Sequence, residues 1–535
     1  MPEKTRPRTD IEPPDFGESR RLNPQRISFS RRGMVATAHF EATRAGAHLL
    51  AEGGNAIDAA AAAAFALGVC EPAASGLGGQ TMMMVHEAAT RRTFALDGSS
   101  RAPNRALPGE LEKHDLLRGH IAATVPSTPA VIAYAVKTYG RKKLSQVLQP
   151  AIELAENGYE VSELQRRLTK RVRGDIKGTP AGDVFLRPDG KLYKVGARFR
   201  QPALAETLRR IAKKGVKEFY RGSIAKAIAA DMEANGGLLR LDDLANIPWP
   251  IERRPVSTTF EGARVMTMPP PGAGRTLVEM LNIVKELPKR YRTPDTPMGA
   301  LHLAEVIRRA FIDRVDRPFD PNFYPQQRGK RMLSEEYAKK VAKEIRDLAR
   351  QKGETTHLSV MDGEGNTVAL TQSIERVFGS RVVTPELGFL YNDYMSAFEY
   401  RDISHPYYLR PNAVPWASVA PTIAFRRRKP WLVIGSPGSE RIVSSIMQVM
   451  LRLVGQSPLD AVAAPRLHCS LEGKVSLEAS RMRADIPPFL ESRGYTVDSR
   501  DPYSFYLGCV QLVVAEREGL VGVADPRRDG SAEGP

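Results

Sequence analysis

Two segments in the second half of the chain, HLSVMD (residues 357–362) and TVALTQS (residues 367–373), constrain the fold most strongly. Alternation of apolar and polar residues in the first, and β-branched residues in the second, are typical of β-strands. The intervening GEGN has the glycines and asparagine of a tight turn, so we expect a β-hairpin. An isolated hairpin is only marginally stable. This hairpin must therefore join a larger sheet, with Thr355 at the entrance of its first strand.

Other segments have the same strand-like texture, namely FEGARVMTM before the hairpin and SRVVTP, APTIAF and PWLVIGS after it. Residues 33–70 read as a short strand and two helices, and residues 126–244 follow helical spacing. No internal repeat is visible. Helices that flank two blocks of antiparallel strands predict a layered α+β or sandwich fold. The turn PPPGAG at 269–274 is of the kind that often borders a site.

Composition excludes several classes of protein. With 42% hydrophobic and 26% charged residues, the chain is expected to fold. Its three cysteines form neither a disulfide framework nor a zinc-like cluster. The N-terminus lacks an apolar signal region, and the longest apolar run, residues 56–69, is shorter than the roughly 20 residues needed to span a bilayer. These features predict a cytoplasmic protein without a membrane segment.

The formal net charge of +17 raises the possibility of nucleic-acid binding. The distribution of the charge argues against it, because residues 1–32 mix eight basic with five acidic residues and RRRK at 426–429 lies between two strand-like segments. We therefore expect no nucleic-acid partner. Residues 1–32 are Pro-rich and polar, and we interpret them as a flexible basic arm that precedes order at Gly33.

Motifs for other chemistries are poorly supported. The turn SGLGGQ at 75–80 lacks the dinucleotide-binding GxGxxG spacing and precedes a hairpin. Ser436 in GSPGS is not in a GxSxG elbow, and no HExxH pair is present. His357 is as consistent with a strand residue as with a metal ligand. Thr355, taken alone, is as consistent with an ordinary strand-entry residue as with a nucleophile.

A resemblance resolves these alternatives. The segment TTHLSVMDGEGNTVALT resembles the hallmark of the γ-glutamyltransferase (glutathione hydrolase) family. Further blocks keep the family's order from about residue 33 to residue 530: GMVATAHFEATRAGAHLLAEGGNAIDAAAAAAFALGVCEPAASGLGG, FYRGSIAKAIAADMEANGGLLRLDDLAN, MPPPGAG, GSPGSERI and ADPRRDG. The resemblance implies an N-terminal nucleophile hydrolase with a four-layer αββα sandwich and no metal or organic cofactor.

The resemblance also implies a precursor that cuts itself between Glu354 and Thr355, giving a large piece (33–354, after the arm) and a small piece (355–535) that stay associated. The amine freed at Thr355 has an unperturbed pKa of roughly 7.7–8.0 and would serve as the base for the Thr355 hydroxyl. By resemblance, Ser373 hydrogen-bonds the nucleophile, and the N–H groups of Gly438 and Ser439 hold the oxyanion. A non-enzymatic scaffold is the alternative from another class.

The residues that match the family's grip on the substrate α-carboxylate have changed. Ser99 stands where the family has Arg, and Arg101 lies two places further on. The family's adjacent serines are Ala417 and Ser418 here. The resemblance therefore leaves Arg101 and Ser418 as candidate substrate-binding residues.

The residues that match the family's ammonium-binding group have changed further, to Glu375, Tyr394 and Ala397. Glu375 and Tyr394 remain candidates for substrate binding, while Ala397 lacks the expected carboxylate. The segment from 397 to 417 is also shorter than the family's lid loop, which favours hydrolysis over transfer to an amine. Two substrates remain open: a γ-glutamyl amide, or another acyl amide that an acylase of the same family would hydrolyse.

Overall fold

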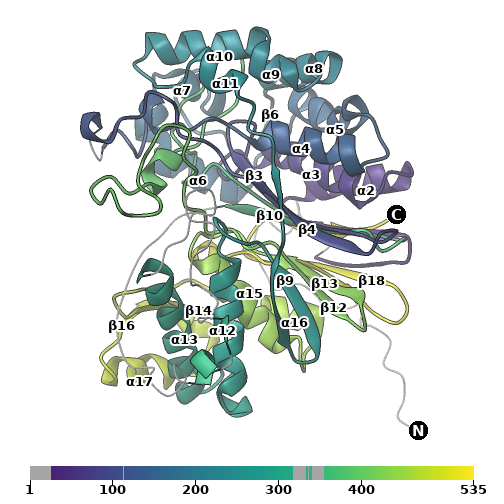
Figure 1. Cartoon of the computed structure of the whole chain (residues 1–535), viewed down its shortest axis with the longest axis vertical. Coiled ribbons are helices and arrows are strands. Elements are labelled where there is room, and N and C mark those ends of the chain that lie inside the picture. The colour runs from purple at the N-terminus through teal and green to yellow at the C-terminus, as the bar shows by residue number, and fades with distance from the viewer. Residues whose placement is uncertain (1–25, 112–113, 317–332, 335, 340–354) are drawn as a thin grey trace.

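The computed structural model describes residues 26–111, 114–316, 333–334, 336–339 and 355–535, and it consists of two stacked antiparallel sheets between two layers of helices (Figure 1). This is the predicted α+β sandwich. The first sheet has the order β1-β18-β17-β13-β12-β9-β8 and the second has the order β19-β2-β10-β11-β3-β4-β7. Two smaller sheets, β14-β15-β16 and β5-β6, lie outside this stack.

The strands have the following bounds: β1 (Ile27–Ser30), β2 (Gly33–Thr37), β3 (Gln80–Glu87), β4 (Arg92–Gly98), β5 (Tyr159–Glu160), β6 (Arg198–Phe199), β7 (Ile251–Arg253), β8 (Val256–Phe260), β9 (Ala263–Thr267), β10 (Thr356–Asp362), β11 (Thr367–Ser373), β12 (Thr422–Arg426), β13 (Lys429–Gly435), β14 (Leu467–Cys469), β15 (Lys474–Leu477), β16 (Thr496–Ser499), β17 (Gln511–Ala515), β18 (Leu520–Ala524) and β19 (Ser531–Glu533).

One helical layer covers the sheet that contains β10: α2 (Phe40–Ala51), α3 (Ala56–Cys70), α4 (Thr128–Tyr139), α5 (Leu144–Asn157), α6 (Glu163–Ile176), α7 (Pro180–Phe185), α8 (Pro202–Lys214), α9 (Lys217–Arg221), α10 (Ser223–Ala234) and α11 (Leu241–Ala245). The other covers the sheet that contains β13: α12 (Gly274–Glu286), α13 (Pro297–Asp316), α15 (Arg441–Arg452) and α16 (Pro458–Ala463). Beyond it, α17 (Ile486–Ser492) packs against α13 and β16. Within the described residues, no helix is long and apolar enough to cross a bilayer.

The β10–β11 hairpin lies at the centre of its sheet, where β10 pairs with β2 and β11 pairs with β3. Leu358 and Val360 point to the helical layer that contains α3, whereas Met361 belongs to the core between the two sheets. Alternating side chains of β10 therefore serve two different cores, as the period of two requires. The strand is buried along its whole length, which holds its first residues rigidly.

Two expectations are corrected by the structure. Order begins before Gly33, because Ile27–Ser30 form β1 and pair with β18 at an edge of the sheet. Polar and basic neighbours are tolerated there, since an edge strand needs only one partner; residues 1–25 lie outside the described residues. The segment SRVVTP forms only an isolated bridge between Val383 and Leu390. Its proline lacks the N–H that a ladder requires.

Candidate active site

Thr355 and Ser373 meet at one end of the central hairpin. The register pairs Thr356 with Gln372, so Thr355 precedes β10 where Ser373 ends β11. The Thr355 hydroxyl donates to Ser373 Oγ over 3.4 Å, and both residues are buried. Ser373 Oγ also accepts the backbone N–H of Glu375 at 2.8 Å. The predicted nucleophile thus lies against a second hydroxyl that is itself held in place. Glu354, the other side of the predicted junction, is outside the described residues.

Tyr394 extends this group of hydroxyls. It lies in the 3-10 helix η5 (Tyr394–Ala397) and is 1% exposed. Its hydroxyl interacts with both Ser373 and the Glu375 carboxylate. Burial, then the nearby charge of Glu375, raise the pKa of Tyr394 well above its ordinary value, so the phenol stays protonated. Tyr394 therefore links the predicted nucleophile to the predicted acyl-binding group. Ala397 ends the same short helix.

A buried ion pair supports the residue that follows Thr355. The Thr356 hydroxyl donates to one oxygen of Glu71, and the Arg528 guanidinium pairs with the other. The side chain of Arg528 is 1% exposed and that of Glu71 is 9% exposed. Glu71 follows α3 and Arg528 lies near the C-terminus, so elements distant in sequence fix the start of β10. Sequence reasoning placed both residues in family-like blocks but gave them no role.

Gly438 and Ser439 lie in the loop between β13 and α15. This loop leaves β13 beside the start of β10, because a Cβ added to Gly435 would lie 2.2 Å from the His357 ring. Gly438 has φ +117° and Ser439 has φ +53°. Both angles are in the range that favours glycine. Ser439 thus adopts a glycine-like backbone conformation although it carries a side chain, and its backbone N–H is the second predicted oxyanion donor.

The loop is braced by the segment before β17. Cys509 N donates to Ser436 Oγ at 3.0 Å, and Ser445 Oγ donates to Leu507 O at 2.8 Å. A Cβ added to Gly438 would come within 3.2 Å of Gly508 Cα. The backbone around residues 507–509 therefore sets the position of Gly438.

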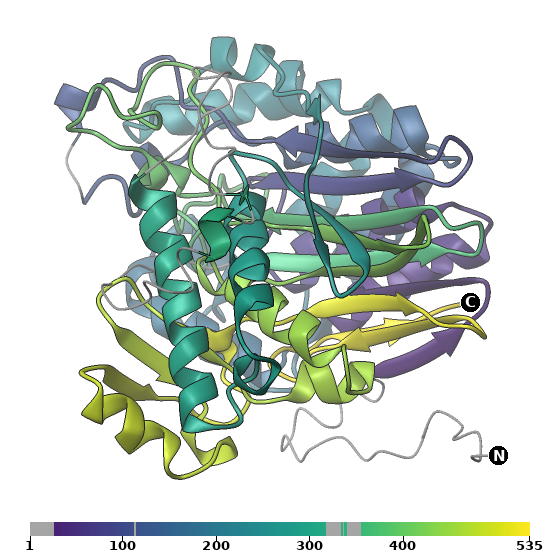
Figure 2. The ribbon, with the colours of Figure 1, turned by 60° about the horizontal axis from the view of Figure 1, so that its bottom comes forward.

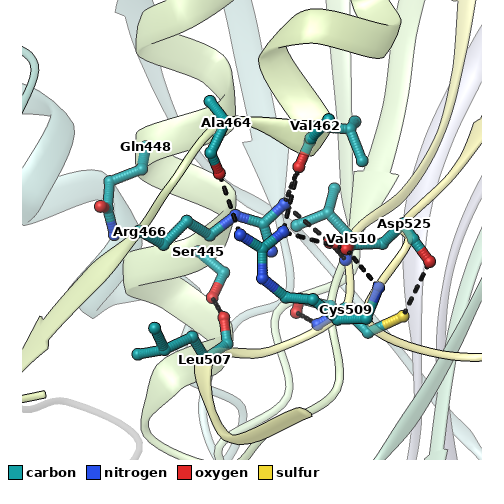
Figure 3. Close-up of polar contacts among 12 residues, drawn as sticks. Ser445, Gln448, Val462, Ala464, Arg466, Leu507, Cys509, Val510 and Asp525 are labelled. Atoms are coloured by element: carbon teal, nitrogen blue, oxygen red, sulfur yellow. Dashed lines mark hydrogen bonds and ion pairs between the residues drawn. The ribbon is translucent and has the colours of Figure 1, made fainter. Parts of the chain in front are cut away.

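A buried network fixes that bracing segment in turn (Figure 3). Asp525 Oδ2 accepts the Val510 N–H at 2.7 Å and pairs with Arg466 at 2.7 Å. Arg527 pairs with the other oxygen of Asp525 at 3.1 Å and with Glu478 at 2.8 Å. The closing ADPRRDG block thus supplies charged side chains that hold the loop containing Gly438 and Ser439 and the start of β10.

Ser99 and Arg101, which the resemblance aligns with or near the family's carboxylate-binding arginine, have different surroundings. The Ser99 hydroxyl donates to Asp97 at 2.6 Å, and Asp97 also pairs with Arg253 at 2.7 Å, so Ser99 is engaged within its own strand end. Arg101 is partly exposed and its backbone forms a bridge with Val125.

Arg314 on α13 is the cation that sequence reasoning missed. Its Nη2 donates to Ala417 O at 2.8 Å, its Nη1 reaches Ser418 Oγ at 3.5 Å, and its guanidinium lies 4.8 Å from the Trp416 ring centre. Burial lowers the pKa of Arg314 to about 10, so the group remains charged at neutral pH. Within the described part of the chain, no carboxylate lies within ion-pair distance of it. Arg314 therefore lies beside Ser418 as a positive charge that a substrate carboxylate could pair with.

The surroundings of the Glu375 carboxyl are rich in positive charge. Burial raises the pKa of Glu375 to about 7, and Arg376, Arg314 and Arg441 oppose this effect. Burial likewise raises the pKa of Asp393 to about 8, while its Oδ1 accepts the Arg376 N–H at 3.0 Å. Glu375 also has φ +74°, a strained angle for a residue with a side chain. Both carboxyls are thus partly protonated at neutral pH, with Arg376, Arg314 and Arg441 near Glu375 and with Arg376 and Arg381 near Asp393.

His357 has a structural environment. Its ring contacts Thr371 Oγ1 at 2.8 Å and Ser359 Oγ at 3.1 Å, and burial lowers the pKa of His357 to about 3. Across the described ranges, no group of three or more His, Cys, Asp or Glu side chains is placed to hold a metal ion. His357 is a neutral strand residue that packs against Gly435.

Comparisons with known proteins agree with this geometry. The gamma-glutamyltranspeptidase family model matches residues 42–534. The chain is 32% identical to the glutathione hydrolase proenzyme of Escherichia coli (strain K12), over 93% of this chain and 91% of that one. It is 31% identical to the glutathione hydrolase-like YwrD proenzyme of Bacillus subtilis (strain 168), over 94% and 98%. Cephalosporin acylase from Bacillus halodurans has a similar structure, with a TM-score of 0.87 at 30% identity, over 100% of this chain and 99% of that one.

Proposed function

The chain belongs to the gamma-glutamyltranspeptidase family, and from this premise we propose that it is a self-processing threonine amidohydrolase that cleaves a γ-glutamyl or related acyl amide. The observation that carries the proposal is Thr355, a buried residue at the head of the central strand whose hydroxyl contacts Ser373 at 3.4 Å. The names of the similar E. coli and B. subtilis proteins, both described as proenzymes, support a precursor.

In the precursor, the Thr355 hydroxyl attacks the carbonyl of Glu354 and displaces the Thr355 nitrogen. This gives an ester, which water then hydrolyses to a Glu354 carboxylate and a free Thr355 amine. The new amine takes the proton of the Thr355 hydroxyl in later turnovers. The rigid start of β10, held through Thr356 by Glu71, keeps the hydroxyl and the scissile carbonyl together.

In turnover, Thr355 Oγ1 attacks the substrate carbonyl, the amine half of the substrate leaves with a proton, and water resolves the ester that remains. Ser373 orients the nucleophile. The N–H groups of Gly438 and Ser439 donate hydrogen bonds to the oxyanion, and one such donor contributes roughly 2.7–4 kcal/mol to transition-state stabilisation in other hydrolases. Apart from the water and the substrate, this scheme uses only groups of the chain itself.

A second candidate, an acylase for a carboxylate-bearing acyl group without an ammonium, is favoured by the charges around Glu375. Arg314, Arg376 and Arg441 surround that carboxyl. An ammonium near these arginines would be repelled, whereas a carboxylate would find Arg314 and Ser418. The similar fold of a cephalosporin acylase agrees with this candidate. A comparison of γ-glutamyl and glutaryl 4-nitroanilides decides between the two, since a preference for glutaryl identifies the acylase.

Thr355→Ala tests the proposal directly. We expect the variant to remain one chain on denaturing electrophoresis and to hydrolyse neither anilide, whereas the wild-type protein gives a fragment whose N-terminus is Thr355 by mass spectrometry. Thr356→Ser is the matched control, because it keeps the hydroxyl that binds Glu71 and should be processed normally. Normal cleavage of Thr355→Ala would assign the wrong threonine.

We further propose that segments 33–354 and 355–535 stay together as the large and small pieces, and that the protein is cytoplasmic. The location is supported by Cys70, Cys469 and Cys509, which are buried free thiols and so suit a reducing compartment.

A further inference from the structure

A large basic cavity adjoins the candidate active site. It has a volume of about 1430 Å³, far more than a glutamyl chain fills. The segment 376–401 and α6 form one side, and the loops around β14, β15 and β16 form the other (Figure 1 labels α6, β14 and β16). The cavity lies close to the predicted acyl-binding residue Glu375, because its lining includes Arg376 and Arg441, whose charges act on the Glu375 carboxyl.

The described lining of this cavity is strongly positive. One side contributes Arg171, Arg376, Arg381 and Arg401, and the other contributes Arg441, Lys474 and Arg500. Glu399 is the single carboxylate in the described lining, and its Oε1 accepts the N–H groups of Tyr400 and Arg401. Seven cations therefore face one acid that is already hydrogen-bonded to the backbone.

Carboxylates behind the lining neutralise only part of this charge. Asp393 pairs with Arg376 at 3.5 Å, Asp175 pairs with Arg381, and Asp498 is shared by Lys474 and Arg500. Asp498 thus serves two of the lining cations, and Asp175 is also shared with Arg118, which is not part of the lining. Arg171 and Arg401 are exposed and have no carboxylate partner within the described residues. Arg500 also has a buried Nε without a hydrogen-bond acceptor in that part of the chain.

We infer that this cavity binds the far end of the substrate's acyl group, and that this end carries at least one negative charge beyond the carboxylate of a glutamyl or glutaryl chain. The inference rests on the proposed function and names its substrate class: amides of an extended, multiply anionic acyl group. Such a group would leave the nucleophile past Glu375 and meet Arg376 and Arg441 first, then the exposed arginines further out. Guanidinium groups suit carboxylate or phosphate oxygens equally in charge and geometry.

The test compares two anilides that differ by one carboxylate in this position: N-acetyl- and N-succinyl-γ-glutamyl 4-nitroanilide. We expect the wild-type enzyme to show a kcat/KM about tenfold higher for the N-succinyl compound at low salt, and the ratio to fall when salt screens the charges. Arg171→Gln/Arg401→Gln and, separately, Arg500→Gln should bring the ratio towards one. The control, Arg483→Gln, removes an exposed arginine that pairs with Asp485 away from the cavity and should leave the ratio unchanged.

The outcomes distinguish failure of the cavity's binding role from failure of the proposed function. Equal kcat/KM values for the two compounds, or a ratio that the cavity variants do not alter, would refute the binding role of the cavity while hydrolysis itself stands. Replacement of the N-succinyl group by a phosphate-bearing extension of similar length distinguishes the two anion types. Failure of the processed protein to cleave any γ-glutamyl, glutaryl or N-acyl anilide would instead overturn the proposed function, and the inference with it.

Discussion

Replacing Arg528 with methionine is predicted to destabilise the fold at the start of β10, next to the candidate nucleophile. Arg528 forms an ion pair with Glu71, which also accepts the Thr356 hydroxyl, and both charged side chains are buried. Methionine keeps much of the arginine's apolar volume but leaves the Glu71 carboxylate without its counter-charge. Removing one partner of a buried pair typically costs about 3–5 kcal/mol, whereas replacing both partners by neutral groups costs much less.

The magnitude translates into a measurable shift in melting temperature. For a chain of 535 residues, the usual unfolding entropy per residue makes this loss equal to about 3–4 °C in apparent Tm. The measurement is best made in a Thr355→Ala background, in which we expect every variant to remain one chain. Arg528→Met should melt about 3–4 °C lower than this background, and Glu71→Gln/Arg528→Met should recover most of the difference.

The pH dependence gives an independent check. Burial already raises the pKa of Glu71 above its ordinary value, and Arg528 opposes that shift. Without Arg528 the folded-state pKa rises further, so the folded protein holds a proton that the unfolded chain releases. Such a group contributes stability below its unfolded pKa of roughly 4.3, and this stability is lost as pH rises towards the folded pKa. The defect of Arg528→Met should therefore grow with pH. An unchanged Tm, or a double variant as unstable as the single one, would refute the argument.

Three shorter predictions concern the site itself. Ser439→Gly should relieve the positive φ and raise stability by about 1 kcal/mol in chemical unfolding, with kcat retained; a loss of kcat would give the hydroxyl a role. Gly438→Ala should lower kcat about 10²-fold, because φ +117° and the nearby Gly508 displace the oxyanion donors. Glu375→Gln should remove the fall in stability between pH 5 and 7 that follows from a folded pKa of about 7, as thermal melts at both pH values would show.

The sequence was sufficient to predict the architecture because the fold depends on patterns that are local. Alternation in residues 357–362 predicted the hairpin, and the strand-like segments on either side of RRRK at 426–429 became β12 and β13. β1 was not predicted because its four residues, ISFS, are too few to show an alternating pattern. They form a strand through their pairing with β18. SRVVTP has strand-like residues, but pairing depends on partners that no local pattern contains.

The candidate site was predictable only where the family's motif is contiguous. Thr355 and Ser373 lie within one hairpin, so the motif that contains the first also places the second. Arg314 lies on α13 and reaches Ser418 through the fold. Nothing in its helical neighbourhood marks it as different from other arginines. The same holds for Glu71 and Arg528, which lie 457 positions apart and meet only in three dimensions.

The arrangement of strands explains why cleavage before Thr355 would not separate the proposed pieces. In one sheet, β2 pairs with β10 and β11 pairs with β3, so the C-terminal hairpin is inserted between two strands from before residue 354. In the other sheet, β18 pairs with β1 and β12 pairs with β9. Figure 2 shows green and yellow strands of the C-terminal segment beside purple and teal strands of the N-terminal one. Separation would expose the unpaired edges and apolar faces of both sheets at once, so the cut releases an amine at Thr355 without releasing either piece.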